Sequence, residues 1–404
     1  MLTVDAALDA MLSALSPLAP VRRPLADCGG AILAEPLVAQ WTQPPFAASA
    51  MDGYAVRSAD LASGSEALRL VGEAGAGHAF DGLVGPGKAV RISTGAPVPD
   101  GADQVVMQEK ASREGDAVRL TDTARPMANI RPAGTDFSHG DRLLEAGRCL
   151  SPEAVALAAA ARVAALHIHP RPRVAIVATG DELVEPGEPA GPSQIVNSVA
   201  PGLVELVRIW GGEPVYLGIA RDRPGAVRDA LRPGRDCDLT VTVGGASVGG
   251  HDHLRAVFQA DGGRFAFERI AARPGKPTWF GTLEGHPLLG LPGNPVSALV
   301  MARLFLRPAL ARLGGSVANA VFAQAPLAVA LEANDWRETY LRATRDEAGR
   351  AAPLSNQDSS ALSALVQADC LIRRPAGASA LAAGEPGEIL PLREGDWSAG
   401  RTAR

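Results

Sequence analysis

The sequence predicts a multi-domain protein of α/β plus β class: a doubly wound, mainly parallel sheet domain, an inserted small β domain and a C-terminal β domain. The length of 404 residues exceeds what one hydrophobic core usually organises, so more than one domain is expected. Strand-like and helix-like segments alternate over residues 171–315, as in a parallel sheet. Short alternating segments separated by glycine and proline occupy residues 41–140 and 316–404, a pattern typical of small β domains.

Two helix-like segments flank the first β region. Apolar residues at helical spacing follow Thr3, which is a suitable N-cap, and an alanine-rich helix begins at Ser151-Pro152-Glu153. We expect these two helices to pack on each other across the inserted β domain, forming a helical or linker domain. The four predicted units are therefore residues 1–40 with 141–170, 41–140, 171–315 and 316–404.

The composition excludes several classes of function. A formal net charge of −5 gives no general attraction to nucleic acid or an anionic membrane, and an aromatic content of 4% provides few stacking platforms for single strands. The longest apolar stretch, residues 154–168, is too short to span a bilayer, and no secretory signal is visible. The four cysteines lie far apart, which argues against a zinc site or a disulfide framework. A cytoplasmic protein without nucleic-acid or membrane partners is expected.

Residues 239–252 combine a strand, a glycine loop and a helix start. The β-branched run 239–243 predicts a buried strand, four glycines follow within residues 244–250, and Asp252 is a suitable cap for a helix over 253–260. Open backbone amides and the helix dipole favour a phosphate at such a place. The spacing matches neither the dinucleotide fingerprint nor the P-loop. A phosphate site and a purely structural turn therefore both remain open.

Five acids stand in loops rather than on helix faces. Each one alone fits a solvated or capping residue, whereas several acids near a phosphate loop suit Mg²⁺, which takes carboxylates, water and substrate oxygens. In a doubly wound sheet, ligands bind beyond the carboxyl ends of the strands, where several of these loops are predicted. The five loop acids are Asp52, Asp136, Glu182, Asp222 and Asp252.

The basic candidates cluster before and within a proline-glycine turn. Arg273 and Lys276 bracket Pro274-Gly275, and Arg269 precedes them by a few residues. A rigid turn between two cations favours an oxyanion clamp over a solvated face. The segment Pro292-Gly293-Asn294-Pro295 fits a turn into a helix and needs no further role. No Ser/His/Asp triad can be assembled from the loops, so covalent hydrolase chemistry is unsupported.

Taken together, the motifs resemble one known family. SAMDGYAV, STGAPVPDGAD, ATGDEL, GGASVGGHD, RPGKP and LPGNPVSA occur in this order over residues 49–298. This set closely resembles the molybdopterin molybdenumtransferase family, which includes bacterial MoeA and the gephyrin E domain. The resemblance implies an elongated four-domain subunit that dimerises, with an α/β domain similar to molybdopterin-binding folds. It also implies Mg²⁺-dependent insertion of molybdate into adenylylated molybdopterin with release of AMP, in molybdenum cofactor biosynthesis.

The resemblance assigns roles to particular residues of this chain. It implies catalytic roles for Asp52, Thr94, Asp136, Asp222 and Asp252. It implies metal contacts from Glu182, Asp222 and Asp252. It implies substrate contacts from Gly244, Gly245, Ser247, Gly249, Arg269, Arg273, Lys276, Pro292, Pro295, Arg337, Arg342 and Ser359.

The expected partners follow from the same resemblance. Asp52 and Thr94 lie far from the α/β loops in sequence, so a site shared between the subunits of a homodimer is expected. A molybdopterin adenylyltransferase is a possible partner that supplies the substrate. The family's usual Lys-Pro-Gly-Lys-Pro begins with Arg273 here, which leaves molybdate and tungstate open as the oxyanion. The alternative functions are a non-catalytic molybdopterin carrier or scaffold, and a molybdopterin adenylyltransferase.

Overall fold

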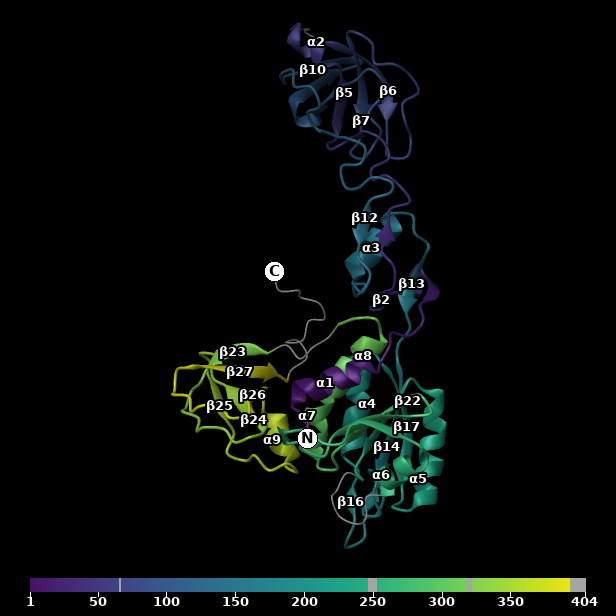
Figure 1. The fold of residues 1–404 in the computed structure, drawn as a ribbon. Helices are drawn as coiled ribbons and strands as arrows, with labels where there is room; N and C mark the ends of the chain where they lie inside the picture. Colours follow the sequence, from purple (N-terminus) through teal and green to yellow (C-terminus); the bar gives the residue numbers. More distant parts are fainter. Residues whose placement is uncertain (65–66, 246–252, 318–321, 393–404) are drawn as a thin grey trace.

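The protein is an elongated arrangement of four units. The computed structural model describes residues 1–64, 67–245, 253–317 and 322–392. Figure 1 shows the inserted β domain at one end, a small intermediate unit next to it, and the α/β domain at the other end with the C-terminal β domain beside it. The predicted multi-domain α/β plus β architecture is confirmed. Within the described ranges, no helix is both long and apolar enough to cross a membrane.

The α/β domain is built on a six-stranded sheet in the order β17-β14-β18-β22-β21-β19. The first four strands run parallel, and β21 and β19 form an antiparallel edge. The central strand β18 is buried along its whole length because helices cover both faces of the sheet. The strands are β14 (Arg173–Thr179), β17 (Glu213–Ala220), β18 (Leu239–Val243), β19 (Arg264–Phe267), β21 (Trp279–Leu283) and β22 (His286–Leu291), with a separate parallel pair β15 (Leu183–Val184) and β16 (Ile195–Val196).

Two groups of helices make the domain doubly wound, as predicted. Helices α5 (Pro224–Leu231) and α6 (His253–Ala260) share one apolar cluster on the first face. On the second face, α4 ends just before Gly211, whose φ of +83° supplies a left-handed stop that glycine readily adopts. The helices of the second face are α4 (Val199–Ile209), α7 (Pro295–Met301), a π-helical turn (Ala302–Leu306), α8 (Arg307–Leu313) and α1 (Val4–Ser13).

The N-terminal helix α1 packs in the α/β core, so its expected packing on the alanine-rich helix is wrong. Its start is as predicted: the Thr3 hydroxyl accepts a hydrogen bond from the Ala6 amide at 3.2 Å. Its apolar stripe, which includes Met11, joins the large cluster around α4 and α8. The alanine-rich helix α3 (Pro152–Ala160) instead packs in a separate cluster of the intermediate unit. The α/β core offers the stripe of α1 a larger apolar surface than the small alanine face of α3.

The intermediate unit and the inserted domain are built from short strands. In the intermediate unit, β1 (Val21–Pro24), β13 (Ala165–His169) and β2 (Ile32–Leu33) form one sheet, and β3 (Leu37–Val38) pairs with β12 (Arg142–Leu144). The pair β4 (Ala48–Ser49) and β11 (Ile130–Arg131) leads into the inserted domain. The inserted domain contains α2 (Ser58–Ala62) and a six-stranded sheet of β8 (Gln104–Met107), β5 (Gly53–Val56), β7 (Lys88–Ile92), β6 (Leu68–Ala74), β10 (Ala117–Leu120) and β9 (Ala111–Glu114).

The C-terminal sheet takes one edge strand from the α/β domain. That strand, β20 (Ala272–Arg273), pairs in parallel with the start of β24, so Arg273 lies opposite Thr339. The predicted oxyanion turn is therefore attached to both domains. The remaining elements are β23 (Ala323–Pro326), β24 (Glu338–Arg345), β25 (Ala351–Pro353), β26 (Cys370–Arg374), β27 (Pro386–Pro391) and α9 (Leu362–Gln367).

Candidate functional site

Two of the predicted acids lie in loops at the carboxyl edge of the parallel sheet. Asp222 follows β17 and Glu182 follows β14, and neighbouring backbone contacts bind the two loops together. The Asp222 amide donates to the Asp181 carboxylate at 3.1 Å, and the Asp181 amide donates to the Asp222 carboxylate at 3.4 Å. Since parallel neighbouring strands bring their carboxyl ends to one edge, these loops form one acidic rim.

A glycine turn follows β18 at the same edge. Gly244 has a φ of +93°, and a Cβ placed on it would lie 2.5 Å from the Thr179 carbonyl oxygen. Only glycine tolerates both the left-handed backbone and this close approach. Gly245 follows with a φ of +60°. The turn is therefore closely packed: Gly244 is buried, and its amide donates to the Leu291 carbonyl at 3.2 Å. The predicted Ser247, Gly249 and Asp252 lie outside the described residues.

The 292–295 turn joins the glycine turn to the C-terminal domain. A Cβ on Gly293 would lie 3.5 Å from the Cα of Gly244, so the two turns are in contact. The Asn294 side-chain amide donates to the Ser359 hydroxyl at 2.8 Å, and the Val296 amide donates to the Ser359 carbonyl at 3.0 Å. Pro295 opens α7 at a position where a missing N–H costs nothing. Ser359 is therefore held against the 292–295 turn and the start of α7.

The 273–276 turn is rigidly packed under its two exposed cations. Gly275 has a φ of +110°, and a Cβ on it would lie 2.4 Å from the sulfur of Met301. The buried Thr278 hydroxyl donates to the Gly275 carbonyl at 2.7 Å. Arg273 and Lys276 extend from this turn into solvent-accessible space. The packing fixes the backbone while leaving the charged ends free to contact a ligand.

A cleft between the α/β domain and the C-terminal domain collects the basic residues. Its cavity volume is about 810 Å³. We call it the cation cleft and define it by the residues Arg273, Lys276, Asn294, Arg337, Arg342, Gln357, Ser359 and Arg374, all of which line it. The predicted Arg269 is exposed but is not among the residues lining this cleft; its carbonyl accepts a hydrogen bond from the Leu2 amide. Arg273, Lys276, Arg337, Arg342 and Ser359 are thus brought together.

Arg342 is one of two buried arginines in the cation cleft, with Arg374. It is 1% exposed, and one terminal nitrogen donates to the Asn356 carbonyl at 3.0 Å. Its Nε has no hydrogen-bond partner among the described residues. Burial lowers the pKa of this guanidinium, and the nearby Asp358 carboxylate opposes that shift. A buried guanidinium remains protonated and carries donors that suit an anionic ligand.

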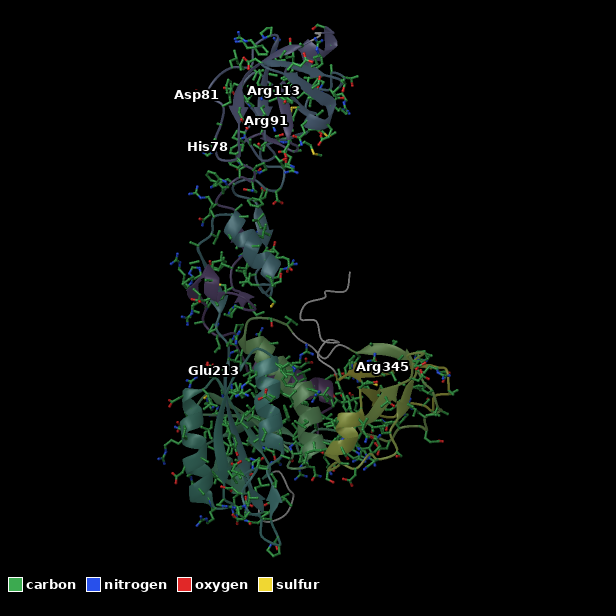
Figure 2. All side chains as sticks on the ribbon, turned by 180° about the vertical axis from the view of Figure 1, so that it is seen from behind. His78, Asp81, Arg91, Arg113, Glu213 and Arg345 are labelled. Atoms are coloured by element: carbon green, nitrogen blue, oxygen red, sulfur yellow. The ribbon has the colours of Figure 1, made fainter. Side chains whose placement is uncertain are left out.

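Asp52 and Thr94 form a separate pair in the inserted domain. The Thr94 amide and hydroxyl donate to one Asp52 carboxylate oxygen at 2.7 and 3.0 Å. These bonds lower the pKa of Asp52, and Arg91, labelled in Figure 2, contributes a smaller effect of the same sign. Asp52 directly precedes β5 and Thr94 follows β7. Both strands belong to the inserted domain, at the far end of the molecule from the α/β sheet (Figure 1). Within one subunit the pair does not join the cation cleft.

Asp136 likewise lies away from the sheet edge. Its amide donates to the Gln43 carbonyl at 3.0 Å, in the chain segment that leads from the inserted domain to the intermediate unit. The carboxylate is exposed. The predicted acids therefore occupy three places: the rim of the α/β sheet, the inserted domain and the connection between that domain and the intermediate unit.

The acidic rim suits Mg²⁺ only in a particular way. No group of three or more His, Cys, Asp or Glu side chains suited to a metal occurs among the described residues. The exposed Glu182 and the half-buried Asp222 nevertheless provide carboxylates in loops at the sheet edge that the glycine turn also occupies. Mg²⁺ commonly uses one or two carboxylates together with water and substrate phosphate oxygens. The donor set therefore fits a substrate-bridging ion rather than an all-protein cage.

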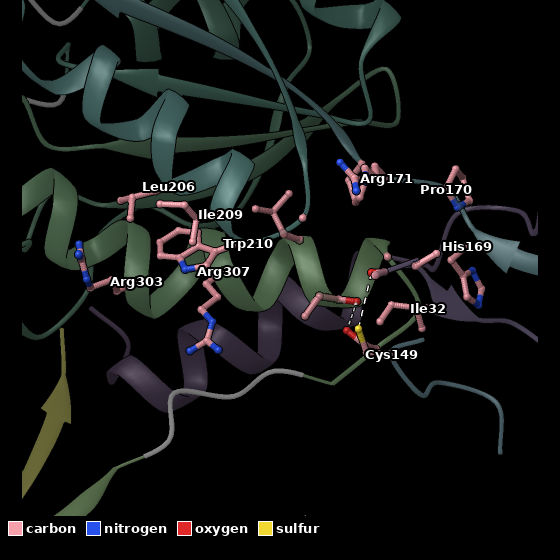
Figure 3. Close-up of a pocket in the computed structure, with 18 of the residues that line it drawn as sticks. Ile32, Cys149, His169, Pro170, Arg171, Leu206, Ile209, Trp210, Arg303 and Arg307 are labelled. Atoms are coloured by element: carbon pink, nitrogen blue, oxygen red, sulfur yellow. Dashed lines mark hydrogen bonds between the residues drawn. The ribbon is translucent and has the colours of Figure 1, made fainter. Parts of the chain in front are cut away.

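A second cavity of about 360 Å³ lies between the α/β domain and the intermediate unit. Figure 3 shows Arg303 and Arg307 beside Trp210 on one side of it, and Cys149 and His169 on the other. Of the described residues that line this cavity, none belongs to the site predicted from the sequence. Its buried Arg307 therefore serves as a comparison for the buried Arg342 of the predicted site.

Three residues of the cation cleft were missed by the sequence reasoning. Asn294 stands inside the 292–295 motif, where its flanking prolines suggested only a turn. Gln357 bridges to the backbone of Arg342: its side-chain oxygen accepts from the Arg342 amide at 3.0 Å, and its side-chain nitrogen donates to the Arg342 carbonyl at 2.9 Å. Arg374 is 3% exposed and donates to the Glu332 carbonyl at 3.0 Å. The alternation of Arg373 and Arg374 on one strand was the available signal, because it sends one arginine to each face.

Comparisons with known proteins cover nearly the whole chain. Three family models match: "MoeA N-terminal region (domain I and II)" over residues 2–161, "Probable molybdopterin binding domain" over 175–312, and "MoeA C-terminal region (domain IV)" over 324–392. A molybdopterin molybdenumtransferase of Nostoc sp. is 36% identical over 322 residues, covering 77% of this chain and 74% of that protein. One of Haemophilus influenzae is 37% identical, covering 78% of each.

A solved structure has the same overall arrangement. The molybdopterin biosynthesis moea protein from Pyrococcus horikosii superposes with a TM-score of 0.85 at 29% sequence identity. The match covers 97% of this chain and 99% of that one. The similarity therefore extends over all four units rather than over the α/β domain alone.

Proposed function

The chain belongs to the molybdopterin molybdenumtransferase family, and we propose that it inserts molybdate into adenylylated molybdopterin with release of AMP. The observation that carries this proposal is the cation cleft, in which the buried Arg342 lies with exposed cations, and which the 292–295 turn connects to the glycine turn at the edge of the α/β sheet. A tetrahedral oxyanion requires several convergent donors, and a pyrophosphate requires neutralised charge. The two adjoining regions offer both.

The cation cleft holds the oxyanion in this proposal. Arg342 provides a fixed charge whose position is set by burial, and Arg273 and Lys276 reach the ligand from the 273–276 turn. Ser359, oriented by Asn294, adds a hydroxyl that can donate or accept. Preorganised donors of this kind stabilise charge without reorganising during the reaction. The cleft chemistry accepts molybdate and tungstate alike.

The glycine turn and the acidic rim receive the pyrophosphate end of the substrate. Gly245, which is only half-buried and has no side chain, allows a phosphate to approach the backbone at this turn. Mg²⁺ would be held by Glu182 and Asp222, together with Asp252 from outside the described residues, and when bound would neutralise charge on the pyrophosphate. The 292–295 turn connects this region to Ser359, so the phosphate and oxyanion ends can be occupied by one substrate.

We further propose that the complete site forms between two copies of the chain. Asp52 and Thr94 lie at the far end of the subunit, and a homodimer with the site at its interface would bring them to the acidic rim. A molybdopterin adenylyltransferase is the proposed supplier of the adenylylated substrate. All four cysteines are free thiols, which supports a reducing, cytoplasmic environment.

The test is AMP release by the purified protein supplied with adenylylated molybdopterin, Mg²⁺ and molybdate. Release of AMP together with molybdenum bound to the pterin is the expected result, and chelating the divalent ion should remove it. Binding of the pterin without AMP release would leave only a carrier or scaffold. Consumption of ATP with free molybdopterin would identify an adenylyltransferase instead.

A further inference from the structure

Beside the cation cleft, on the C-terminal sheet, lies a cluster centred on Arg373. Arg373 and Arg374 are neighbours on β26, so their side chains leave opposite faces of the sheet. Arg374 lines the cation cleft. Arg373, with its side chain 17% exposed, lies among three carboxylates that come from three different elements: Asp5 on α1, Glu338 on β24 and Glu388 on β27.

Glu338 is the principal partner of Arg373. Its carboxylate accepts from the guanidinium Nε at 2.8 Å and from a terminal nitrogen at 3.3 Å, and its side chain is 10% exposed. The Tyr340 hydroxyl donates to the same carboxylate. Paired, charge-assisted hydrogen bonds in a buried place fix geometry more tightly than exposed ion pairs. Phe322 completes the surroundings, with its ring centroid 4.6 Å from the guanidinium carbon.

The cluster is connected through the backbone to the 273–276 turn. The Glu338 amide donates to the Ala271 carbonyl at 2.9 Å, and the Ala271 amide donates to the Leu2 carbonyl at 2.8 Å. Leu2 leads directly into α1, whose Asp5 carboxylate lies 3.6 Å from the Arg373 guanidinium. A closed circuit of contacts therefore runs around the segment that enters the turn. Arg373 closes this circuit by contacting both Glu338 and Asp5.

We propose that Arg373 is a positioning residue for the cation cleft. By holding Glu338 and Asp5 together it fixes β20 against β24, and so sets where Arg273 and Lys276 stand relative to Arg342 and Arg374. Arg373 leaves β26 on the face opposite to Arg374, and the described residues that line the cleft do not include it. The choice of molybdate as ligand rests on the proposed function, whereas the effect on the position of the turn does not.

The proposal separates from a merely structural role by two measurements on the full-length protein. For Arg373→Met we expect KM for molybdate to rise on the order of tenfold while kcat changes by less than about threefold, because displaced donors weaken oxyanion binding. Amide hydrogen exchange over residues 269–278 should speed up on the order of tenfold, because the strand pairing loosens. Exchange over residues 173–179 should not change. Arg373→Lys, which keeps the charge but loses the paired donors, should give KM and exchange values between those of the wild-type protein and Arg373→Met.

Arg345→Met is the matched control. Arg345 leaves the far end of β24 (Figure 2) and its Nε lies 3.3 Å from the Asp369 carboxylate, so it is another arginine–carboxylate pair of the same sheet. It should leave both KM for molybdate and exchange over 269–278 unchanged. If Arg373→Met does not fold, Glu338→Gln provides the same readouts. Its amide oxygen can still accept one hydrogen bond from Arg373, but the negative charge and the second acceptor are lost.

The proposal is overturned if the Arg373 or Glu338 variant folds with unchanged exchange over 269–278, or if Arg345→Met alters that exchange equally. Failure of the proposed function would have a different signature. In that case the wild-type protein would release no AMP, and the exchange measurement would still decide whether Arg373 positions the turn.

Discussion

The cation cleft and the Asp52–Thr94 pair differ in how completely one subunit builds them. The cleft is formed by five segments that are separate in sequence, and its Arg342 is 1% exposed. The Asp52 carboxylate is instead exposed and accepts hydrogen bonds from the Thr94 amide and hydroxyl. One subunit thus already has a pocket at one end, whereas the acid at the other end lies on an exposed surface. The substitutions that follow test that difference.

Removing the buried charge of the cleft should have the largest effect. For Arg342→Met we expect kcat/KM for molybdate to fall about 10²- to 10³-fold, because a buried charge contact to an anion contributes several kcal/mol. Steady-state AMP release at varied molybdate measures this. Arg307→Met is the control: Arg307 is 8% exposed and lines the second cavity (Figure 3). Similar losses for both variants would show that burial of the arginine matters rather than its place in the cleft.

Complementation tests whether the Asp52–Thr94 pair works across a subunit interface. Asp52→Ala and Asp222→Ala homodimers should each lose most of their activity, because each site then lacks one acid. When equal amounts are unfolded and refolded together, half of the dimers are mixed and each has one intact site, so about a quarter of the wild-type activity should return. Subunit mixing is checked by two affinity tags. Mixed dimers that remain inactive would place all of the required acids in one subunit.

Gly275→Ala tests the rigidity of the turn beneath the cleft. The φ of +110° and the contact with Met301 should together lower the free energy of unfolding by about 2–4 kcal/mol. Gly285→Ala is the matched control, since Gly285 has a φ of +83° with open space around it, so about 1 kcal/mol is expected there. Denaturant unfolding of both variants gives the comparison. Equal losses would mean that Met301 does not restrict the turn.

The smallest and most selective of these effects is expected for Thr94→Val, which should shift only the pH dependence of the activity through Asp52. Hydrogen bonds from Thr94 lower the pKa of Asp52, so the carboxylate stays ionised to a lower pH than an ordinary aspartate. In Thr94→Val this pKa should rise, and activity that needs ionised Asp52 should then fail at a higher pH on the acid side. The kcat/KM–pH profile measures the shift. An unmoved acid limb would show that Asp52 ionisation does not govern the rate.

The elements that follow from local pattern could be predicted from the sequence. The β-branched run of β18, the Gly211 stop of α4 and the Thr3 cap of α1 each depend on a few neighbouring residues. The cluster of Arg273, Lys276, Arg342 and Ser359 was expected from family resemblance, and the structure brings those side chains to one cleft. Their assignment to the oxyanion remains a prediction.

What could not be predicted depends on contacts between distant segments. The sequence of α1 specifies an apolar stripe but not which core receives it, and the stripe packs on α8 rather than α3. The two residues of β20 are too few to show that they would extend the C-terminal sheet. The separation of Asp52 from the acidic rim arises because the inserted domain projects away from the sheet (Figure 1), a geometry that no local pattern encodes.

The most direct test is to locate the oxyanion. Crystals soaked with molybdate and measured at the molybdenum absorption edge give its position without any assumption about mechanism. We predict one anomalous peak in the cation cleft, within hydrogen-bond reach of Arg342 and Ser359, that is absent in Arg342→Met crystals. A peak at Arg307 in the second cavity, or an unchanged peak in the Arg342→Met crystals, would contradict the account.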